Sequence, residues 1–290
     1  MGIEVELSPS EGRRLNQETK ESENGKEAVI NAFREFGLEM DIAKHPDLLS
    51  RLVDIGEHFH DAVEMARMID KIWDKLSVDD ADYDNLLTAT LLHDIGKAGP
   101  LKISPDSPLR PMFKKLFPHG NSEAKNFDDL AVAAGFSDSQ SLAESLSGEQ
   151  TPISGEMPAI DFWRYHADWT YEVLNQAGVG EEITRIAASH HILEGKNPAR
   201  LADEEISSES KILEVADKYH AHGYRVLAIM DKYQAIRERG AARSHEEIIA
   251  FLHRIVDKSR VSEQLKKDYH EIIDHIFAGA KNDLEKALKK

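Results

Sequence analysis

The apolar residues of this chain recur at helical spacing over most of its length. Between Leu48 and Leu76, apolar side chains return every three or four positions, which is the pattern of one buried helix face. The apolar stretch that ends at His93 predicts a second, buried helix starting near Asp80. No segment shows the alternation that is typical of a half-buried strand. The pattern therefore predicts an all-α fold, built as a helical bundle.

Glycines mark several of the expected helix ends. Gly178 and Gly240 follow periodic segments, and Gly223 is expected to break another. Residues 1–24 are polar, show no period and are expected to form a loose arm. The remaining expected helices span 26–40, 160–176, 181–193, 208–222, 226–239, 245–257 and 263–288.

Residues 98–160 interrupt the helical pattern with seven of the chain's ten prolines. This composition predicts loops with short helices near 108–117 and 127–147. A long proline-rich stretch inside a helical domain is typical of an insertion with a function, and here it is long enough to form a lid. The expected organisation is an N-terminal arm and helix (1–47), a helical domain (48–257) that carries the insertion, and a C-terminal helix (258–290).

Composition narrows the chemistry. The hydrophobic fraction of 41% is ample for a core, and the absence of cysteine excludes disulfides, zinc–thiolate sites and thiol catalysis. Any metal must be held by His, Asp or Glu, and the chain has 14 histidines. The net charge of −17 disfavours a long nucleic-acid partner but allows a small phosphorylated substrate beside a metal.

The N-terminal residues MGIEVELSPSEG contain acidic residues and no apolar segment, so they do not resemble a secretory signal. No apolar run approaches the length of a membrane span. We therefore expect a soluble, cytoplasmic protein without a membrane partner. The sequence leaves the oligomeric state open.

The stretch Leu91–Lys97 places His93 and Asp94 side by side at the end of an apolar helix. Imidazole and carboxylate both bind divalent metals. Adjacent helical residues point about 100° apart, so both reach one ion only near a helix end. We expect Gly96 to provide that end by entering the left-handed conformation. Lys97 follows at a position where it could hold a phosphate.

Other ligand-type residues lie on apolar helix faces elsewhere in the chain. Taken alone, each has an ordinary structural interpretation, as a hydrogen-bonded core histidine or a surface acid. Together they place His or Asp on five helices, which is how helical bundles build metal sites. These residues are His58, His93, Asp94, His166, His190, His191 and Asp217.

His58 competes with His60 for the first of these positions. His58 shares a helix face with Ala62, Met65 and Ile69, whereas His60 is turned about 160° away. We therefore expect His58 to be the ligand.

This order of residues resembles the HD superfamily of metal-dependent phosphohydrolases, and more narrowly its HD-GYP branch, which hydrolyses cyclic di-GMP. The resemblance covers roughly residues 50–255. It rests on HDIGK at 93–97, RIAASHHILEG at 185–195 and KILEVADKYHA at 211–221, and ARSHEEIIAFL at 242–252 also resembles the segment that closes HD-GYP domains.

The resemblance implies two divalent metal ions, iron or manganese given ligands of His and carboxylate only. One ion would be held by His58, His93, Asp94 and Asp217. Asp94 would bridge to a second ion held by His166, His190 and His191. A metal-activated hydroxide would then attack phosphorus in line. Asp94 and Lys97 would be the catalytic residues, with Lys97 steadying the phosphate.

Asp54 lies where some members of the branch place a ligand for a third metal, although an acid in the first turn of a helix is the simpler explanation.

The chain departs from the branch near the histidine pair. Ile192 stands where the branch has Glu, and the loop 194–198 keeps only Gly195 and Pro198 of its signature, with Asn197 in place of Tyr. Both changes touch the substrate side. The resemblance therefore implies phosphoester hydrolysis with weak or absent activity on cyclic di-GMP. The cations expected nearest the phosphate are Lys97, Lys196 and Arg164.

Two other functions remain open. One is a signalling or binding module that keeps the fold without catalysis, although such domains usually lose ligands that this chain keeps. The other is an oxygenase, because some HD-fold proteins use a di-iron pair to oxidise an organic substrate. Lys97 favours hydrolysis.

Overall fold

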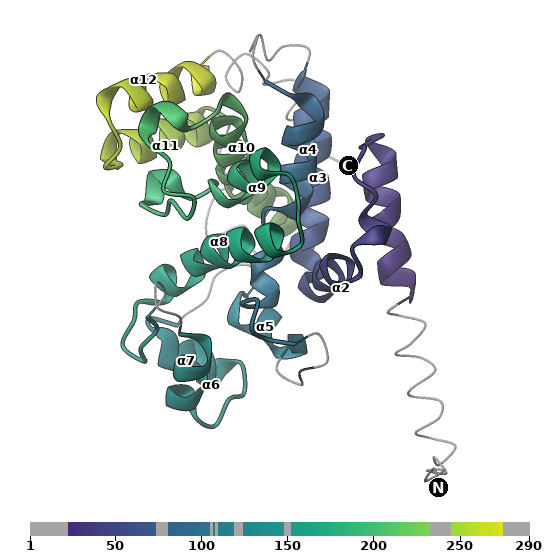
Figure 1. Ribbon diagram of the computed structural model, residues 1–290. Coiled ribbons are helices and arrows are strands. Elements are labelled where there is room, and N and C mark those ends of the chain that lie inside the picture. The colour runs from purple at the N-terminus through teal and green to yellow at the C-terminus, as the bar shows by residue number, and fades with distance from the viewer. Residues whose placement is uncertain are drawn as a thin grey trace, which may run out of the picture.

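The structure is a computed structural model that describes residues 23–73, 81–104, 107, 110–118, 124–147, 152–232 and 245–274; within these ranges the side chains of 111, 114, 221–232 and 245 are not described. Across these ranges the regular elements are helices and no strand is present, which confirms the all-α prediction (Figure 1). The helices are 23–35, η1 (Ile42–Lys44), α2 (Pro46–Ile55), α3 (Glu57–Ile72), α4 (Tyr83–Leu92), η3 (Ile95–Ala98), α5 (Arg110–Leu116), α6 (Phe127–Ala133), α7 (Ser139–Leu146), α8 (Ala159–Gln176), α9 (Glu181–Ala188), η4 (Ile192–Glu194), η5 (Asp203–Glu205), α10 (Ser208–Lys232), α11 (His245–Lys258) and α12 (Glu263–Ile272).

Helix α4 is packed against several other helices of the bundle, and this burial accounts for its apolar sequence. Its N-terminus is capped by Asp82, whose carboxylate accepts a hydrogen bond from the backbone N–H of Asn85 at 2.8 Å. From Leu86 to Leu92 every residue is buried, because α3, α9 and α10 pack around it. The end of α4 therefore delivers His93 and Asp94 into the interior rather than to the surface.

The expected single helix from Leu48 onward is wrong, because Gly56 divides it into α2 and α3. Gly56 has φ 53° and ψ −106°, a combination that residues with a side chain rarely adopt. The periodicity continues across the break because both helices face the same core, so the apolar pattern does not reveal it. Residues 74–76 lie outside the described part of the chain.

The expected break at Gly223 is also wrong, since α10 runs without interruption from Ser208 to Lys232. A glycine inside a helix costs only about 1 kcal/mol relative to alanine, and a long packed helix tolerates that cost. The expected end at Gly240 lies outside the described residues.

The insertion forms short helices, as predicted, and packs on α8. Phe113, Phe117 and Phe127 contact an aromatic face of α8 and make an apolar cluster distinct from that of the main bundle. The chain before α6 is joined to the chain before α8 by a hydrogen bond from the Phe127 backbone N–H to the Met157 carbonyl at 2.8 Å. The expected helix over 127–147 is two helices, α6 and α7. Figure 1 shows α8 running between these insertion helices and the rest of the bundle.

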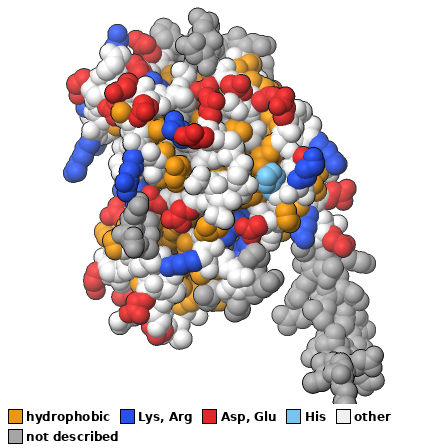
Figure 2. All heavy atoms as spheres, viewed as in Figure 1, with side chains coloured by type: hydrophobic (Ala, Val, Ile, Leu, Met, Phe, Trp, Pro, Cys, Tyr) orange, Lys and Arg blue, Asp and Glu red, His pale blue; other side chains and the backbone are white. Residues whose placement is uncertain are grey.

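On the face shown in Figure 2, acidic and basic side chains are interspersed and do not form one basic patch. In the described part of the chain, no helix is both long enough and apolar enough to cross a bilayer.

Candidate metal centre

Four histidines and one aspartate come together where three helices meet. His93 and Asp94 follow the end of α4, His166 lies within α8, and His190 and His191 follow the end of α9. His93, Asp94, His166 and His190 are all less than 7% exposed. Their ligand atoms form two overlapping groups that could hold a metal ion, one of His93, Asp94 and His190 and one of His166, His190 and His191.

Asp94 lies between these histidines. Its Oδ1 is 3.0 Å from His166 Nε2 and 3.9 Å from His190 Nε2, while its Oδ2 is 3.6 Å from His93 Nε2. Asp94 has φ −94° and ψ 3°, outside the regular helix, so its side chain turns away from the direction that the helix would impose. The adjacent pair thus converges at the end of α4, and its binding of a metal stays a prediction.

The backbone sets the hydrogen position on three of the histidine rings. Nδ1 donates to the carbonyl oxygen three residues earlier in His93 (Thr90, 2.7 Å), His166 (Trp163, 2.5 Å) and His190 (Ala187, 2.7 Å). A carbonyl only accepts, so Nδ1 must carry the hydrogen. Nε2 of each neutral ring is then a lone-pair donor, which is the state a metal requires.

Two ring nitrogens, Nε2 of His166 and Nε2 of His190, face each other and bear on whether a metal ion fits here. These two atoms are 2.8 Å apart, and when both rings are neutral with the hydrogen on Nδ1, two lone pairs face each other. Two buried acceptors at this distance repel unless a metal ion or a proton lies between them. With the Asp94 carboxylate next to both rings, these donors suit a divalent ion that accepts nitrogen and oxygen ligands.

The electrostatics keep these groups in their ligand forms. Burial raises the pKa of the Asp94 carboxyl, but His93 and Lys97 outweigh it and hold that pKa well below its usual range. Burial, reinforced by His191 and His93, lowers the pKa of His190 well below its ordinary value. Burial likewise lowers the pKa of His191 to about 4. At neutral pH, Asp94 is therefore a carboxylate, and the His190 and His191 rings are neutral.

His191 is oriented by a side chain instead of a carbonyl. Its Nδ1 is 2.5 Å from Oε2 of Glu194, which lies in η4. A carboxylate behind a histidine ligand fixes the ring and makes its other nitrogen more basic. The sequence reasoning missed this role of Glu194; its position three residues after His191 is the signal that could have indicated it. The two histidines follow α9, whereas the expected helix 181–193 would have placed them inside its last turn.

Gly96 is required for a reason other than the expected one. It lies inside η3 and is not among the glycines with positive φ. A Cβ at this position would lie 2.0 Å from the His166 carbonyl oxygen and 2.7 Å from the Thr170 nitrogen. Gly96 therefore permits the turn after α4 to approach the backbone of α8. Thr170 holds that contact by donating to the His93 carbonyl at 2.8 Å and accepting from the Gly96 N–H at 3.1 Å.

Lys97 lies at the edge of the cluster, beside Asp94 and His58. Its ammonium is 2.5 Å from Asp94 Oδ2 and 3.3 Å from His58 Nδ1. Nε2 of His58 points to the Phe117 carbonyl at 2.8 Å, so His58 is next to the cluster but not among its converging ligand atoms. His60 is exposed, as its helix face predicts. The assignment of His58 as a ligand stays a prediction.

Asp217 borders the centre, and Asp54 pairs with an arginine of the insertion. Asp217, on α10, has Oδ1 3.8 Å from His93 Nε2 and a side chain 26% exposed. Asp54, on α2, is 2.9 Å from Nε of the buried Arg110. The role of Asp54 as a third-metal ligand stays a prediction.

The other two predicted phosphate contacts already have acidic partners. Arg164 lies 2.9 Å from Asp161 and 3.5 Å from Glu194. The Lys196 ammonium is 3.1 Å from Asp168 and lies over the Tyr165 ring at 3.6 Å from its centroid. Arg164 is a residue of α8 and Lys196 contacts that helix, and a phosphate contact would require each cation to share its acidic partner.

The insertion reaches the centre through Phe117. The Phe117 ring packs edge-on against the His166 ring, with centroids 5.9 Å apart, and stacks on Phe162 at 5.3 Å. Its carbonyl also accepts from His58. The insertion is therefore placed to limit what reaches His166.

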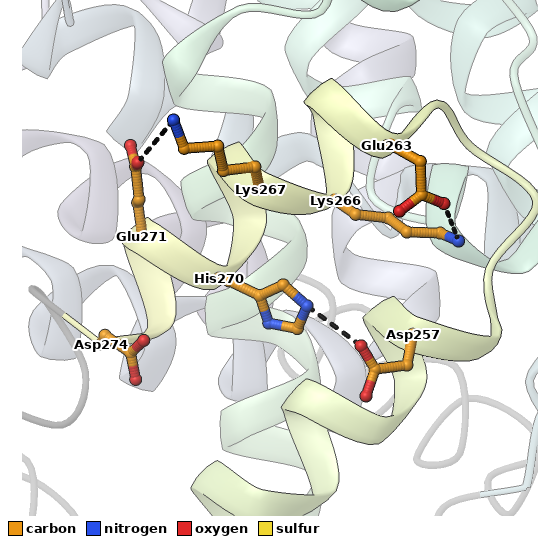
Figure 3. A pocket seen from close by; sticks show the side chains of 7 residues that line it. All are labelled: Asp257, Glu263, Lys266, Lys267, His270, Glu271 and Asp274. Atoms are coloured by element: carbon orange, nitrogen blue, oxygen red, sulfur yellow. Dashed lines mark hydrogen bonds and ion pairs between the residues drawn. The ribbon is translucent and has the colours of Figure 1, made fainter.

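A second group of charged side chains lies apart from this centre, in a pocket between α11 and α12 (Figure 3). His270 pairs there with Asp257 at 3.1 Å and Lys266 with Glu263 at 2.7 Å. These partners satisfy one another, so the pocket offers no comparable set of converging ligand atoms.

In comparisons with known proteins, the chain matches no family model, and neither a curated protein nor a solved structure matches it significantly. The chain's own residues are therefore what supports a function.

Proposed function

We propose that this chain is a metal-dependent phosphohydrolase of the HD type, which cleaves a small phosphoester of the nucleotide or cyclic-dinucleotide class. The observation that carries the proposal is the 2.8 Å separation between Nε2 of His166 and Nε2 of His190, next to the buried Asp94 carboxylate. A bound metal ion would satisfy both ring nitrogens and the carboxylate, and Lys97 of HDIGK lies at the edge of the cluster.

The residues divide into two ligand sets. His93, Asp94 and Asp217, joined by His58, would hold one ion, and His166, His190 and His191 would hold a second. The position of Asp94 supports a bridging role, because Oδ1 faces His166 and Oδ2 faces His93. Bound iron or manganese would supply Lewis acidity and an activated water.

The protein's own side chains would prepare the phosphoester. Lys97 keeps a positive charge beside Asp94, where a phosphate oxygen could replace the carboxylate as its partner. Phe117 and the aromatic face of α8 exclude water from the His166 side, which strengthens every charge interaction inside.

The test begins with metal content. Protein stripped with a chelator is reconstituted with Mn²⁺, or with Fe²⁺ without oxygen, and bound metal per chain is measured; we expect about two ions, as in two-metal hydrolases. Loaded protein is then assayed on cyclic dinucleotides, a generic phosphodiester and nucleotide monophosphates. A metal content near zero after reconstitution contradicts the proposal.

Two further outcomes separate the alternatives. Bound metal without turnover of any phosphoester would identify a silent binding module, and oxygen consumption with an organic substrate would identify an oxygenase. The pair His58→Ala and His60→Ala tests the first ligand, since only His58→Ala should lose metal. The reverse result would place the ligand at His60.

A further inference from the structure

A lysine is buried directly behind the two adjacent histidines. Lys218 follows Asp217 on α10, and its side chain is 6% exposed. Removing an ammonium from water costs several kcal/mol unless acceptors replace the lost hydration. The surroundings of Lys218 must therefore supply such acceptors.

Three acceptors surround its ammonium. Lys218 Nζ donates to the His190 carbonyl at 3.2 Å, and lies 3.5 Å from Glu214 Oε1 and 3.9 Å from Glu194 Oε1. The two carboxylates outweigh the effect of burial and raise the pKa of Lys218, so the group is a fixed positive charge at neutral pH. The His190 carbonyl accepts a hydrogen bond from the ammonium, and both carboxylates lie within ion-pair distance of it.

Two of these three contacts involve a candidate ligand or the residue that orients one. The carbonyl belongs to His190 itself, and Glu194 is the carboxylate that orients His191 through Nδ1 at 2.5 Å. Glu214, one helical turn before Lys218, accepts the backbone N–H of Leu193 at 2.8 Å. Lys218 and Glu214 of α10 thus contact the turn 190–194 at three points, which are the His190 carbonyl, the Leu193 N–H and the Glu194 side chain.

From these contacts we infer that Lys218 is a positioning residue of the metal centre, which fixes the turn 190–194 so that His190 and His191 both present Nε2 to the ion. This inference rests on the metal binding of the proposed function, and not on its hydrolytic step. Without the ammonium, the buried Glu194 carboxylate would keep Arg164, at 3.5 Å, as its cationic partner. Glu194 would then be drawn toward Arg164, and His191 would lose the carboxylate that fixes its ring.

The experiment compares Lys218→Met with Lys211→Met. Lys211 also lies on α10 and pairs with Asp268 of α12 at 2.7 Å, with a side chain 12% exposed, so it is a matched buried ion pair away from the centre. Mn²⁺ affinity is measured by calorimetry on stripped protein. We expect Lys218→Met to weaken binding by about ten- to a hundredfold, the range found for residues behind metal ligands, and Lys211→Met to leave it unchanged.

A ring-nitrogen readout separates positioning from general loss of stability. The ¹⁵N shifts of the histidine side chains report which nitrogen carries hydrogen, and His191 should change from one tautomer to a mixture in Lys218→Met only. Glu194→Gln, at a side chain 25% exposed, should weaken Mn²⁺ binding as well. In the double variant the two losses should not add, because both act through His191.

Wild-type Mn²⁺ affinity in Lys218→Met would overturn the inference. If that variant does not fold, Glu194→Gln decides, and wild-type affinity there overturns it equally. A wild-type protein that binds no Mn²⁺ refutes the proposed function and this inference together. Metal binding that depends on Lys218, in a protein without phosphoester turnover, refutes hydrolysis alone.

Discussion

Asp94 lies between the histidines of the candidate centre, with one oxygen toward His166 and the other toward His93. The carboxylate of this one residue lies within 4 Å of ring nitrogens of three histidines, His93, His166 and His190. The carboxylate is also the partner of Lys97, so it balances the only ammonium within 4 Å of it among the described residues. Loss of its charge should therefore affect both the ion and the cation beside it.

The substitution Asp94→Asn keeps the shape of this side chain and removes its charge. We expect Mn²⁺ affinity to fall at least about a hundredfold, more than for a residue behind a ligand, and phosphoester turnover to disappear with helix content unchanged. Asp168→Asn is the matched control, because Asp168 pairs with Lys196 outside the cluster. Wild-type metal content in Asp94→Asn would show that Asp94 is not a ligand.

Gly96→Ala tests the close approach of two backbones. The new Cβ would collide with the His166 carbonyl and the Thr170 nitrogen, and neither backbone atom can move cheaply. We expect a loss of about 3 kcal/mol or more in unfolding free energy, together with weaker metal binding. Gly180→Ala is the control, since its nearest neighbour is 4.0 Å away and its cost should stay below about 1 kcal/mol. Equal denaturation midpoints for both variants would contradict this account.

At the scale of elements, the proposed substrate specificity depends on the loop after the histidine pair. Asn197 stands where the HD-GYP signature has Tyr, and its amide is already engaged. Asn197 Nδ2 donates to the Leu201 carbonyl at 2.7 Å, and Oδ1 accepts the Leu201 N–H at 3.0 Å. The side chain therefore closes its own loop, and these two bonds fix its orientation.

We expect weak or absent turnover of cyclic di-GMP by metal-loaded protein, with a generic phosphodiester or a nucleotide monophosphate preferred. Bound metals would supply Lewis acidity and an activated water for hydrolysis, whereas the loop and the insertion at Phe117 would select the substrate by shape. The measurement is kcat/KM on each substrate. A value on the order of 10⁴ M⁻¹s⁻¹ or more for cyclic di-GMP would refute this specificity and leave the metal centre standing.

At the scale of the whole molecule, buried charges connect the centre to the C-terminal helices. Glu214 is fully buried on α10, with one oxygen on the Leu193 N–H and the other accepting from Tyr269 of α12. Burial raises the pKa of Glu214 to about 7, against the opposing pull of Lys218. The folded protein therefore holds a proton here that the unfolded chain releases at lower pH.

This raised pKa predicts how stability depends on pH. Since the folded value of about 7 exceeds the unfolded value of 4.5, the contribution of Glu214 is greatest at low pH and is lost as pH rises toward and through 7. Between pH 5 and pH 8 the metal-free protein should lose about 2 kcal/mol more unfolding free energy than Glu214→Gln, at ~1.4 kcal/mol per unit. Urea titrations at both pH values measure this difference. Parallel changes in the two proteins would contradict it.

The sequence by itself determined the helical class, the short helices of the insertion, and the outward position of His60 relative to His58. It also indicated that His93 and Asp94 converge at a helix end, and five of the predicted ligands do come together. These features follow from periodicity and from chain-neighbour geometry, which are local properties. A helix that buries one face has the same repeat whatever covers that face.

Only the tertiary structure decided which surfaces meet. Position 96 requires glycine because the backbone of α8 lies too close for a Cβ. Lys218 is buried against the carbonyl of His190, 28 residues earlier in the chain. The break at Gly56 and the continuity of α10 through Gly223 were also decided by packing, since a glycine permits a turn without requiring one. Close approaches and buried ion pairs depend on distances between segments remote in the chain, and no repeat along the sequence contains those distances.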